Sequence, residues 1–232
     1  MAGSVILSGG NDFSPEGNAL VKAVLSLARQ PDPRLIVVPV AATDNPRRAA
    51  RNSTGAFSAL GAKAEPVLIA DAATANDPTE SAPLESAHIV YLTDGNPLDA
   101  VTILAGSEAL AKLGRAWQRG VVLAASGAAA MALCDLYWDS GVWEKGLGLL
   151  KGIVVLPHHE FLAGRFSAAR LRQDLPAGYL ILGLDNAMGV IIDGQQASVV
   201  GPEAVTVYRA EGEQEYADGD RFDLDAPLDS PG

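Results

Sequence analysis

The stretch from Gly120 to Leu133 constrains the fold more than any other part of the chain. It reads Gly-Val-Val-Leu-Ala-Ala-Ser-Gly-Ala-Ala-Ala-Met-Ala-Leu, so a short apolar strand passes directly into small, helix-favouring residues. In a sharp strand-turn-helix elbow the two backbones come into van der Waals contact, which excludes side chains larger than a methyl group near the apex. The alanines and glycines here meet that demand, and we predict an elbow. An ordinary junction between a strand and a helix is the competing interpretation.

The remaining apolar runs predict how this elbow is embedded. Residues 35–40 form a continuous apolar run, which is typical of a strand covered on both faces of a parallel sheet. Strands are also expected at 4–7, 64–70, 88–93 and 152–157, and helices at 16–29, 47–60, 98–104 and 107–119. This alternation predicts an α/β fold with a mostly parallel central sheet and helices on both faces. Short strands at 179–185, 189–194, 197–200 and 204–209 predict a β-rich C-terminal portion.

Charge and composition narrow the function classes. The net charge is −11, and residues 211–232 hold eight acidic residues and one arginine. We therefore expect a single domain over residues 1–210 and an acidic hairpin or tail over 211–232. The chain lacks the basic stripe that nucleic-acid binding requires, and no apolar run approaches the ~20 residues of a membrane span. One cysteine, Cys134, fits a reducing compartment, so a cytoplasmic location without a membrane or nucleic-acid partner is expected.

Polar residues follow two of the predicted strands. Asp94, Gly95 and Asn96 come directly after residues 88–93, and His158 with His159 and Glu160 follows residues 152–157. Binding groups in doubly wound sheets gather at the carboxyl ends of strands. These residues are therefore candidates to line one pocket with the elbow. On a strand, His159 would point to the side opposite His158, so no metal site with two histidines is expected.

Several segments together resemble peptidase family S51, which includes dipeptidase E and cyanophycinase within the class I glutamine amidotransferase-like superfamily. The segments are residues 38–42 (Val-Pro-Val-Ala-Ala), 94–97 (Asp-Gly-Asn-Pro), 120–133, 156–158 (Leu-Pro-His), 183–187 (Gly-Leu-Asp-Asn-Ala) and 200–208. Each motif alone is weak, but together they span nearly the whole chain. The resemblance implies hydrolysis of peptide or isopeptide bonds next to aspartate, by a serine, a histidine and an acid, without metal or organic cofactor.

The resemblance also implies site residues. Ser126 would be the nucleophile and His158 the base, with the backbone amides of Gly95 and Gly127 as oxyanion donors. Asp139 is the acid that we assign, while Asp135 and Glu144 lie in the same region and stay open as alternatives. The remaining residues expected to line the oxyanion site or pocket are Asp94, Asn96, Ala128, His159 and Glu160.

Two departures from the family pattern put this set in question. The family elbow reads Gly-x-Ser-Ala-Gly-Ala, and an alignment without gaps puts Gly127 at the serine position and Ser126 one residue early. The alternative register, with Ser126 as nucleophile, needs a one-residue adjustment on both sides. Asp94 stands where the family has the first glycine of Gly-Gly-Asn, and a carboxylate ~4 Å from a forming oxyanion would cost about 4 kcal/mol at an effective dielectric near 20.

Three hypotheses about function follow, and the sequence leaves open whether the chain is an enzyme. The first is a serine hydrolase acting through Ser126 and His158. The second is a non-catalytic homologue that binds a small peptide or amino acid in the inherited pocket, alone or as a homodimer. The third is a different acid-base chemistry that uses Asp94, His158 and Glu160.

Overall fold

A computed structural model describes residues 2–162 and 167–224, and its framework is a central eight-stranded sheet. The strand order is β14-β11-β10-β1-β5-β4-β2-β3. Five strands run parallel, namely β1 (Val5–Ser8), β2 (Arg34–Val38), β3 (Lys63–Pro66), β4 (Ile89–Leu92) and β5 (Val122–Ser126). An antiparallel extension adds β10 (Gly189–Asp193), β11 (Gln196–Val200) and β14 (Arg221–Asp223). The expected mostly parallel sheet is confirmed.

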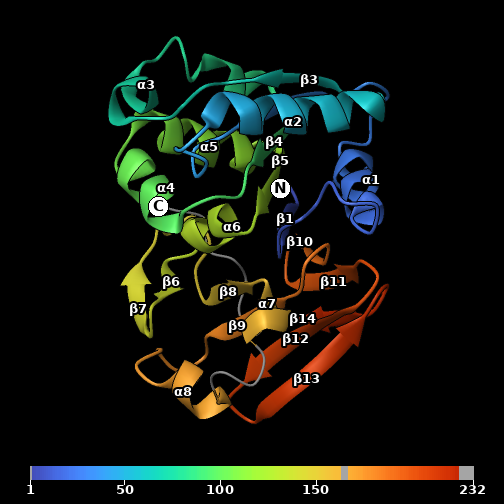
Figure 1. Ribbon diagram of the computed structural model, residues 1–232, viewed down its shortest axis with the longest axis vertical. Coiled ribbons are helices and arrows are strands. Elements are labelled where there is room, and N and C mark those ends of the chain that lie inside the picture. Colours follow the sequence, from blue (N-terminus) through green and yellow to red (C-terminus); the bar gives the residue numbers. More distant parts are fainter. Residues whose placement is uncertain (1, 163–166, 225–232) are drawn as a thin grey trace.

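Helices cover both faces of this sheet, as the sequence predicted (Figure 1). On one face lie α1 (Asn18–Leu27) and α2 (Pro46–Ala59), which pack on a cluster that includes Ile6, Leu35 and Tyr91. On the other face lie α3 (Ala72–Asn76), α4 (Pro97–Leu104), α5 (Glu108–Gln118) and α6 (Ala128–Leu133), and a 3-10 turn, η1 (Ala82–Ser86), precedes β4. Successive side chains of each buried strand point to opposite faces of the sheet. Because helices cover both faces, these strands are apolar throughout.

A second, β-rich body follows the elbow helix and forms the lower part of Figure 1. A four-stranded sheet has the order β13-β12-β9-β8, with β8 (Ile153–Pro157), β9 (Leu180–Leu184), β12 (Ala204–Arg209) and β13 (Gly212–Ala217). Beside it lie the hairpin β6 (Leu136–Asp139) and β7 (Val142–Lys145) and the short helices α7 (His159–Leu162) and α8 (Ala168–Arg172). The predicted β-rich C-terminal portion is therefore present.

The acidic C-terminal segment contributes strands to both sheets. β13 pairs with β12, and β14 pairs with β11 of the central sheet. Residues 225–232 of the predicted tail lie outside the described residues. None of the described helices has both the length and the hydropathy needed to cross a membrane.

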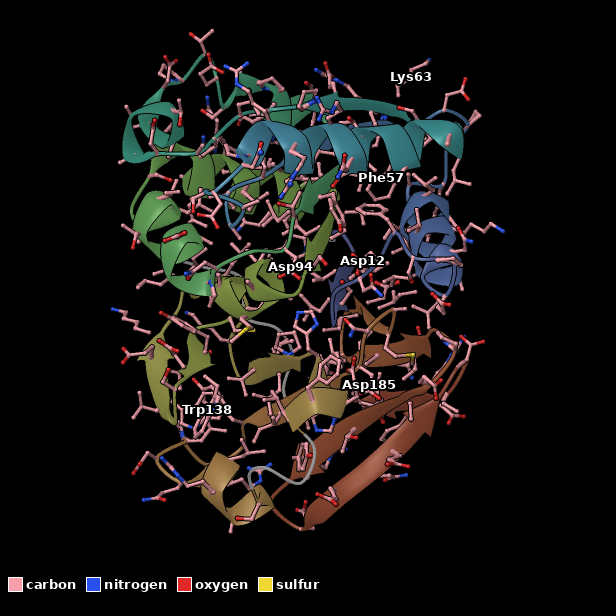
Figure 2. All side chains as sticks on the ribbon, viewed as in Figure 1. Asp12, Phe57, Lys63, Asp94, Trp138 and Asp185 are labelled. Atoms are coloured by element: carbon pink, nitrogen blue, oxygen red, sulfur yellow. The ribbon has the colours of Figure 1, made fainter. Side chains whose placement is uncertain are left out.

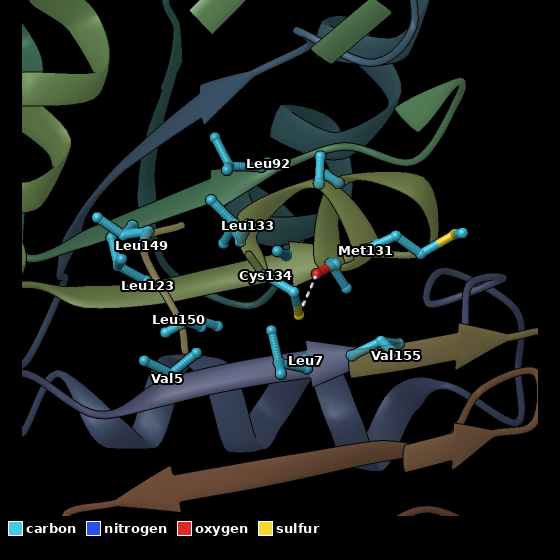
Figure 3. Packing of buried hydrophobic residues seen from close by; sticks show 14 of the residues in the cluster. Val5, Leu7, Leu92, Leu123, Met131, Leu133, Cys134, Leu149, Leu150 and Val155 are labelled. Carbon is cyan, nitrogen blue, oxygen red and sulfur yellow. Dashed lines mark hydrogen bonds between the residues drawn. The ribbon is translucent and has the colours of Figure 1, made fainter. Parts of the chain in front are cut away.

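Helix α6 is buried on all sides, which fixes the elbow in place. Its six residues are all buried, and Figure 3 shows Leu133 and the following Cys134 among Leu7, Leu123 and Leu150 of the surrounding elements. The Cys134 thiol donates to the Ala130 carbonyl at 3.5 Å, and burial raises its pKa, so it stays a protonated thiol. A helix enclosed in this way cannot shift along its axis without opening cavities.

Candidate functional site

Gly127 forms the apex of the elbow between β5 and α6. Its backbone has φ 50° and ψ −115°, a region that side-chain-bearing residues rarely adopt. Its N–H donates to the Ser8 carbonyl of β1 at 3.0 Å, so this amide is already occupied within the sheet. The oxyanion donor that we expected at Gly127 is therefore turned inward, and the first amide that faces the pocket belongs to Ala128.

The carboxylate of Asp94 fills the space above this apex. Its Oδ1 accepts hydrogen bonds from the backbone N–H of Gly95 at 2.7 Å and of Ala128 at 2.8 Å. A Cβ built on Gly127 would lie 2.1 Å from the same oxygen, which is inside any permitted contact. A side chain at position 127 and the present Asp94 carboxylate therefore exclude one another, and two amides suited to an oxyanion already hold a carboxylate.

His158 lies at the end of β8 and faces Asp94. The residue is in the left-handed region at φ 49°, and its N–H donates to the Gly9 carbonyl at 3.0 Å. Its Nε2 is 3.4 Å from Asp94 Oδ2, and its Nδ1 is 2.8 Å from Asn186 Oδ1. A residue with this backbone conformation, held by the residue that follows β1, is typical of a functional position.

The electrostatics of this pair favour the charged forms. Contact with Asp94 raises the pKa of His158 to about 9, and the contact with Asn186 adds to this effect. Burial alone would raise the pKa of Asp94, but hydrogen bonds from His158, Ala128 and Gly95 lower it below its ordinary value. At neutral pH the pair is an imidazolium and a carboxylate, and an imidazolium has no lone pair with which to take a proton from a serine.

Asn186 and Glu160 hold the far side of the imidazole. The Asn186 N–H donates to Glu160 Oε2 at 3.0 Å, and the Asn186 amide group donates to Glu160 Oε1. This fixes Asn186 Oδ1 toward His158, which is the place where an acid was expected. The sequence analysis did not single out Asn186, although it lies in the segment 183–187, which is one of those that resemble the family.

The three acids considered as partners of His158 lie elsewhere. Asp139 ends β6, is exposed and accepts a hydrogen bond from the Ser140 hydroxyl at 2.9 Å. Asp135 accepts from the Tyr179 hydroxyl, and Glu144 is exposed on β7 opposite Tyr137. In the described part of the chain, the side-chain contacts of His158 run to Asp94 and Asn186 rather than to these acids.

His159 belongs to a separate cluster. It begins helix α7 instead of continuing a strand, because the left-handed backbone of His158 ends β8. The side chain is buried, with Nε2 2.8 Å from the Tyr208 hydroxyl and Nδ1 3.4 Å from Asp185 Oδ1. It therefore packs inside the β-rich body and does not line the space beside Asp94. Asn96 caps helix α4, where its Oδ1 accepts from the Leu98 N–H at 2.9 Å.

Ser126 lies on the other side of the sheet from the elbow helix. It is 2% exposed and shares its strand face with Val122 and Ala124, which pack under α1 and α2. Its hydroxyl lies beside the carboxylate of Asp12 and acts to lower the pKa of that group. Ser126, Asp12 and Asp94 all line a cavity of about 360 Å³. Figure 2 shows Asp12 and Asp94 at the boundary between the helix-covered sheet and the β-rich body.

Within the described residues, no group of three or more histidine, cysteine, aspartate or glutamate side chains is arranged to hold a metal ion. The groups brought together at the elbow are therefore Asp94, His158, Asn186 and Glu160, with the amides of Gly95 and Ala128. We call these residues and Gly127 the elbow site.

Comparisons with known proteins agree with this architecture. The model of peptidase family S51 matches residues 5–200. A crystal structure of a peptidase from an acI-B1 Actinobacterium superposes with a TM-score of 0.81 at 19% identity, covering 96% of this chain and 97% of that one. A putative peptidase E protein from Listeria monocytogenes EGD-e superposes with a TM-score of 0.59 at 14% identity, covering 90% and 99%. No curated protein matches the sequence.

Proposed function

The chain belongs to peptidase family S51, and from that premise we propose that it is a non-hydrolytic member, which binds a small peptide or amino acid beside its altered elbow. One observation carries the proposal, namely that the Asp94 carboxylate occupies the space above Gly127 and takes the Gly95 and Ala128 amides. An acyl-transfer site needs a nucleophile at the apex and free donors for the oxyanion. Here the apex has no side chain and the donors are filled.

The charge state of His158 supports the same proposal. A general base works best when its pKa lies near the operating pH, whereas contact with Asp94 raises the pKa of His158 to about 9. The imidazolium is instead suited to hold the Asp94 carboxylate in place. A cytoplasmic location and a homodimeric state stay predictions of this proposal.

A serine hydrolase that acts through Ser126 is the second candidate. The observation in its favour is that the Ser126 hydroxyl lies beside the Asp12 carboxylate at the wall of a cavity. Burial raises the pKa of Asp12, so this carboxylate could accept a proton from Ser126. This candidate needs no change at Gly127, but it lacks a histidine partner for Ser126 among the described contacts.

The test combines labelling, turnover and binding. The purified protein is treated with a fluorophosphonate probe beside an active S51 peptidase, and Asp-containing dipeptides are assayed for hydrolysis and, by calorimetry, for binding. We expect dipeptide binding without turnover and no adduct on Ser126. Turnover or labelling that disappears in Ser126→Ala would establish the second candidate and end the first.

A further inference from the structure

Among the described residues, the buried Asp12 carboxylate is held only by neutral groups. It is 5% exposed, and its Oδ1 accepts from the Ser8 hydroxyl and its Oδ2 from the Tyr91 hydroxyl, each at 2.7 Å. Ser126 supplies a further hydroxyl contact. Buried carboxylates in proteins are usually paired with a cation, because hydroxyl donors alone only partly offset the loss of hydration.

The cavity beside Asp12 supplies no cation from the protein. About 360 Å³ in volume, it is within the range of small-molecule sites. Asp12 and Asp94 both line it, and none of its lining residues in the described chain is lysine, arginine or histidine. His158 lies outside the lining but pairs with the Asp94 carboxylate, which leaves Asp12 as the lining carboxylate without a cationic partner among the described residues. The cavity is therefore acidic, with Asn11 and Asn52 as its uncharged polar groups and the partly exposed ring of Phe13 at its edge.

Thr93 adds an unsatisfied polar atom to the same wall. The residue is 4% exposed, and its Oγ1 is buried with no hydrogen-bond partner in the described part of the chain. The Thr93 N–H continues the ladder to the Val38 carbonyl, so alternation along the strand turns its side chain to the face of Tyr91. Tyr91 and Thr93 both line the cavity. An unpaired buried hydroxyl is costly, and it marks a place where a ligand would supply the missing partner.

Resting on the proposed function, we infer that this cavity binds the ammonium group of an amino acid or of a peptide N-terminus. The Asp12 carboxylate, which has no cationic partner among the described residues, balances its charge, and Thr93 Oγ1 accepts one of its three N–H groups. An ammonium ion is a donor with no acceptor capacity, and it therefore matches a site that offers carboxylates and a hydroxyl. The aliphatic part of the ligand would pack against Phe13, whose ring is 39% exposed.

The experiment compares ligands that differ only at the amine. Four dipeptides with free N-termini, Asp-Ala, Gly-Gly, Leu-Ala and Lys-Ala, are titrated beside their N-acetylated forms, and n-butylammonium chloride serves as the minimal ammonium probe. Binding is followed by calorimetry and by amide chemical shifts near Thr93. We expect acetylation to weaken binding at least about tenfold, because it removes a charge-assisted contact.

Variants test the assigned groups. Thr93→Val should weaken binding of the free-amine peptides about threefold and leave binding of the acetylated peptides unchanged. It should keep or raise thermal stability, because the lost hydroxyl has no partner among the described residues. Asp12→Asn should weaken binding of the free-amine peptides at least about tenfold, provided that circular dichroism shows the variant to be folded. Asp99→Asn, which removes a carboxylate lining a neighbouring cavity, is the control for net charge and should change nothing.

The outcomes separate the two proposals. Equal binding of free and acetylated peptides would overturn the ammonium inference while leaving peptide binding in place. Binding of n-butylammonium without any dipeptide would support the ammonium site and reject the peptide ligand. Absence of binding by all probes would reject both, and a loss of stability in Thr93→Val would show that its hydroxyl already has a partner.

Discussion

The carboxylate of Asp94 and the Cα of Gly127 occupy complementary space, since a Cβ on Gly127 would lie 2.1 Å from Asp94 Oδ1. The two departures from the family pattern therefore form one structural unit. A serine at position 127 requires the Asp94 carboxylate to leave its present place or to be replaced, and the carboxylate in its present place requires glycine at position 127. Because of this coupling, the residue at either position has to be considered together with the residue at the other.

A serine introduced at position 127 should accordingly destabilise the protein unless Asp94 is also changed. We expect Gly127→Ser to destabilise the protein by roughly 1–3 kcal/mol through the backbone at φ 50°, and by more through the overlap with Asp94. The double variant Asp94→Gly/Gly127→Ser should recover the part that comes from the overlap. Chemical denaturation of both single variants and the double variant measures this coupling.

Gly194→Ser is the matched control for this experiment. Gly194 has φ 62°, and a Cβ there would meet nothing within 4 Å, so it reports the backbone cost without an overlap. The overlap with Asp94 would make no contribution to stability if Gly127→Ser lowers the free energy of unfolding no more than Gly194→Ser does. The same conclusion would follow if replacing Asp94 restores none of the lost stability.

The ionisation of His158 should depend on Asp94. Contact with Asp94 raises the pKa of His158 to about 9, from an ordinary value of 6.5. In Asp94→Asn the charge is lost, so we expect the pKa of His158 to fall toward the ordinary value. NMR titration of the imidazole carbon resonances reads this directly. A titration near pH 6.5 in the unmodified protein would show that the ion pair does not form in solution.

Stability should fall on the alkaline side because of the same pair. The pKa of His158 is raised in the folded state, so its contribution is complete below about pH 6.5 and is lost as pH rises through about 9. The loss should be modest, because the side chain is 41% exposed and solvent screens the pair. Thermal melts between pH 6 and 10 should show a smaller decline in Asp94→Asn, and parallel curves would assign the decline to other groups.

An acid at position 186 should be incompatible with Glu160. The Asn186 side chain donates to Glu160 Oε1, so Asn186→Asp would bring two carboxylates into contact. The new carboxylate would also face the His158 imidazolium, and this attraction offsets part of the repulsion. We expect a net loss of at most about 1 kcal/mol at neutral pH, relieved near pH 4 where carboxylates take up protons. Adding Glu160→Gln should restore stability at neutral pH. A variant as stable as the parent at pH 7 would mean that Asn186 and Glu160 do not hold each other in solution.

Much of the framework could be predicted from local patterns. The continuous apolar run at 35–40 requires burial on both faces, and β2 is indeed a central strand of a parallel sheet. The small residues from Ala124 to Ala130 allow the strand and the helix to approach closely, and Gly127 is the apex of the turn between them. These features are set within a few residues of one another, where sterics and burial act without long-range context.

The composition of the site was decided only by the tertiary structure. Asn186 reaches His158 from 28 residues away, and Asp94 meets Ala128 across 34 residues. The acid that we assigned, Asp139, belongs to a hairpin that the fold directs elsewhere, and His159 turns inward because His158 ends its strand. Periodicity and burial determine which segments become strands and helices, whereas contacts among polar side chains depend on how loops from separate strands converge. The sequence therefore determined the sheet and the elbow, and only folding brought Asp94 over Gly127.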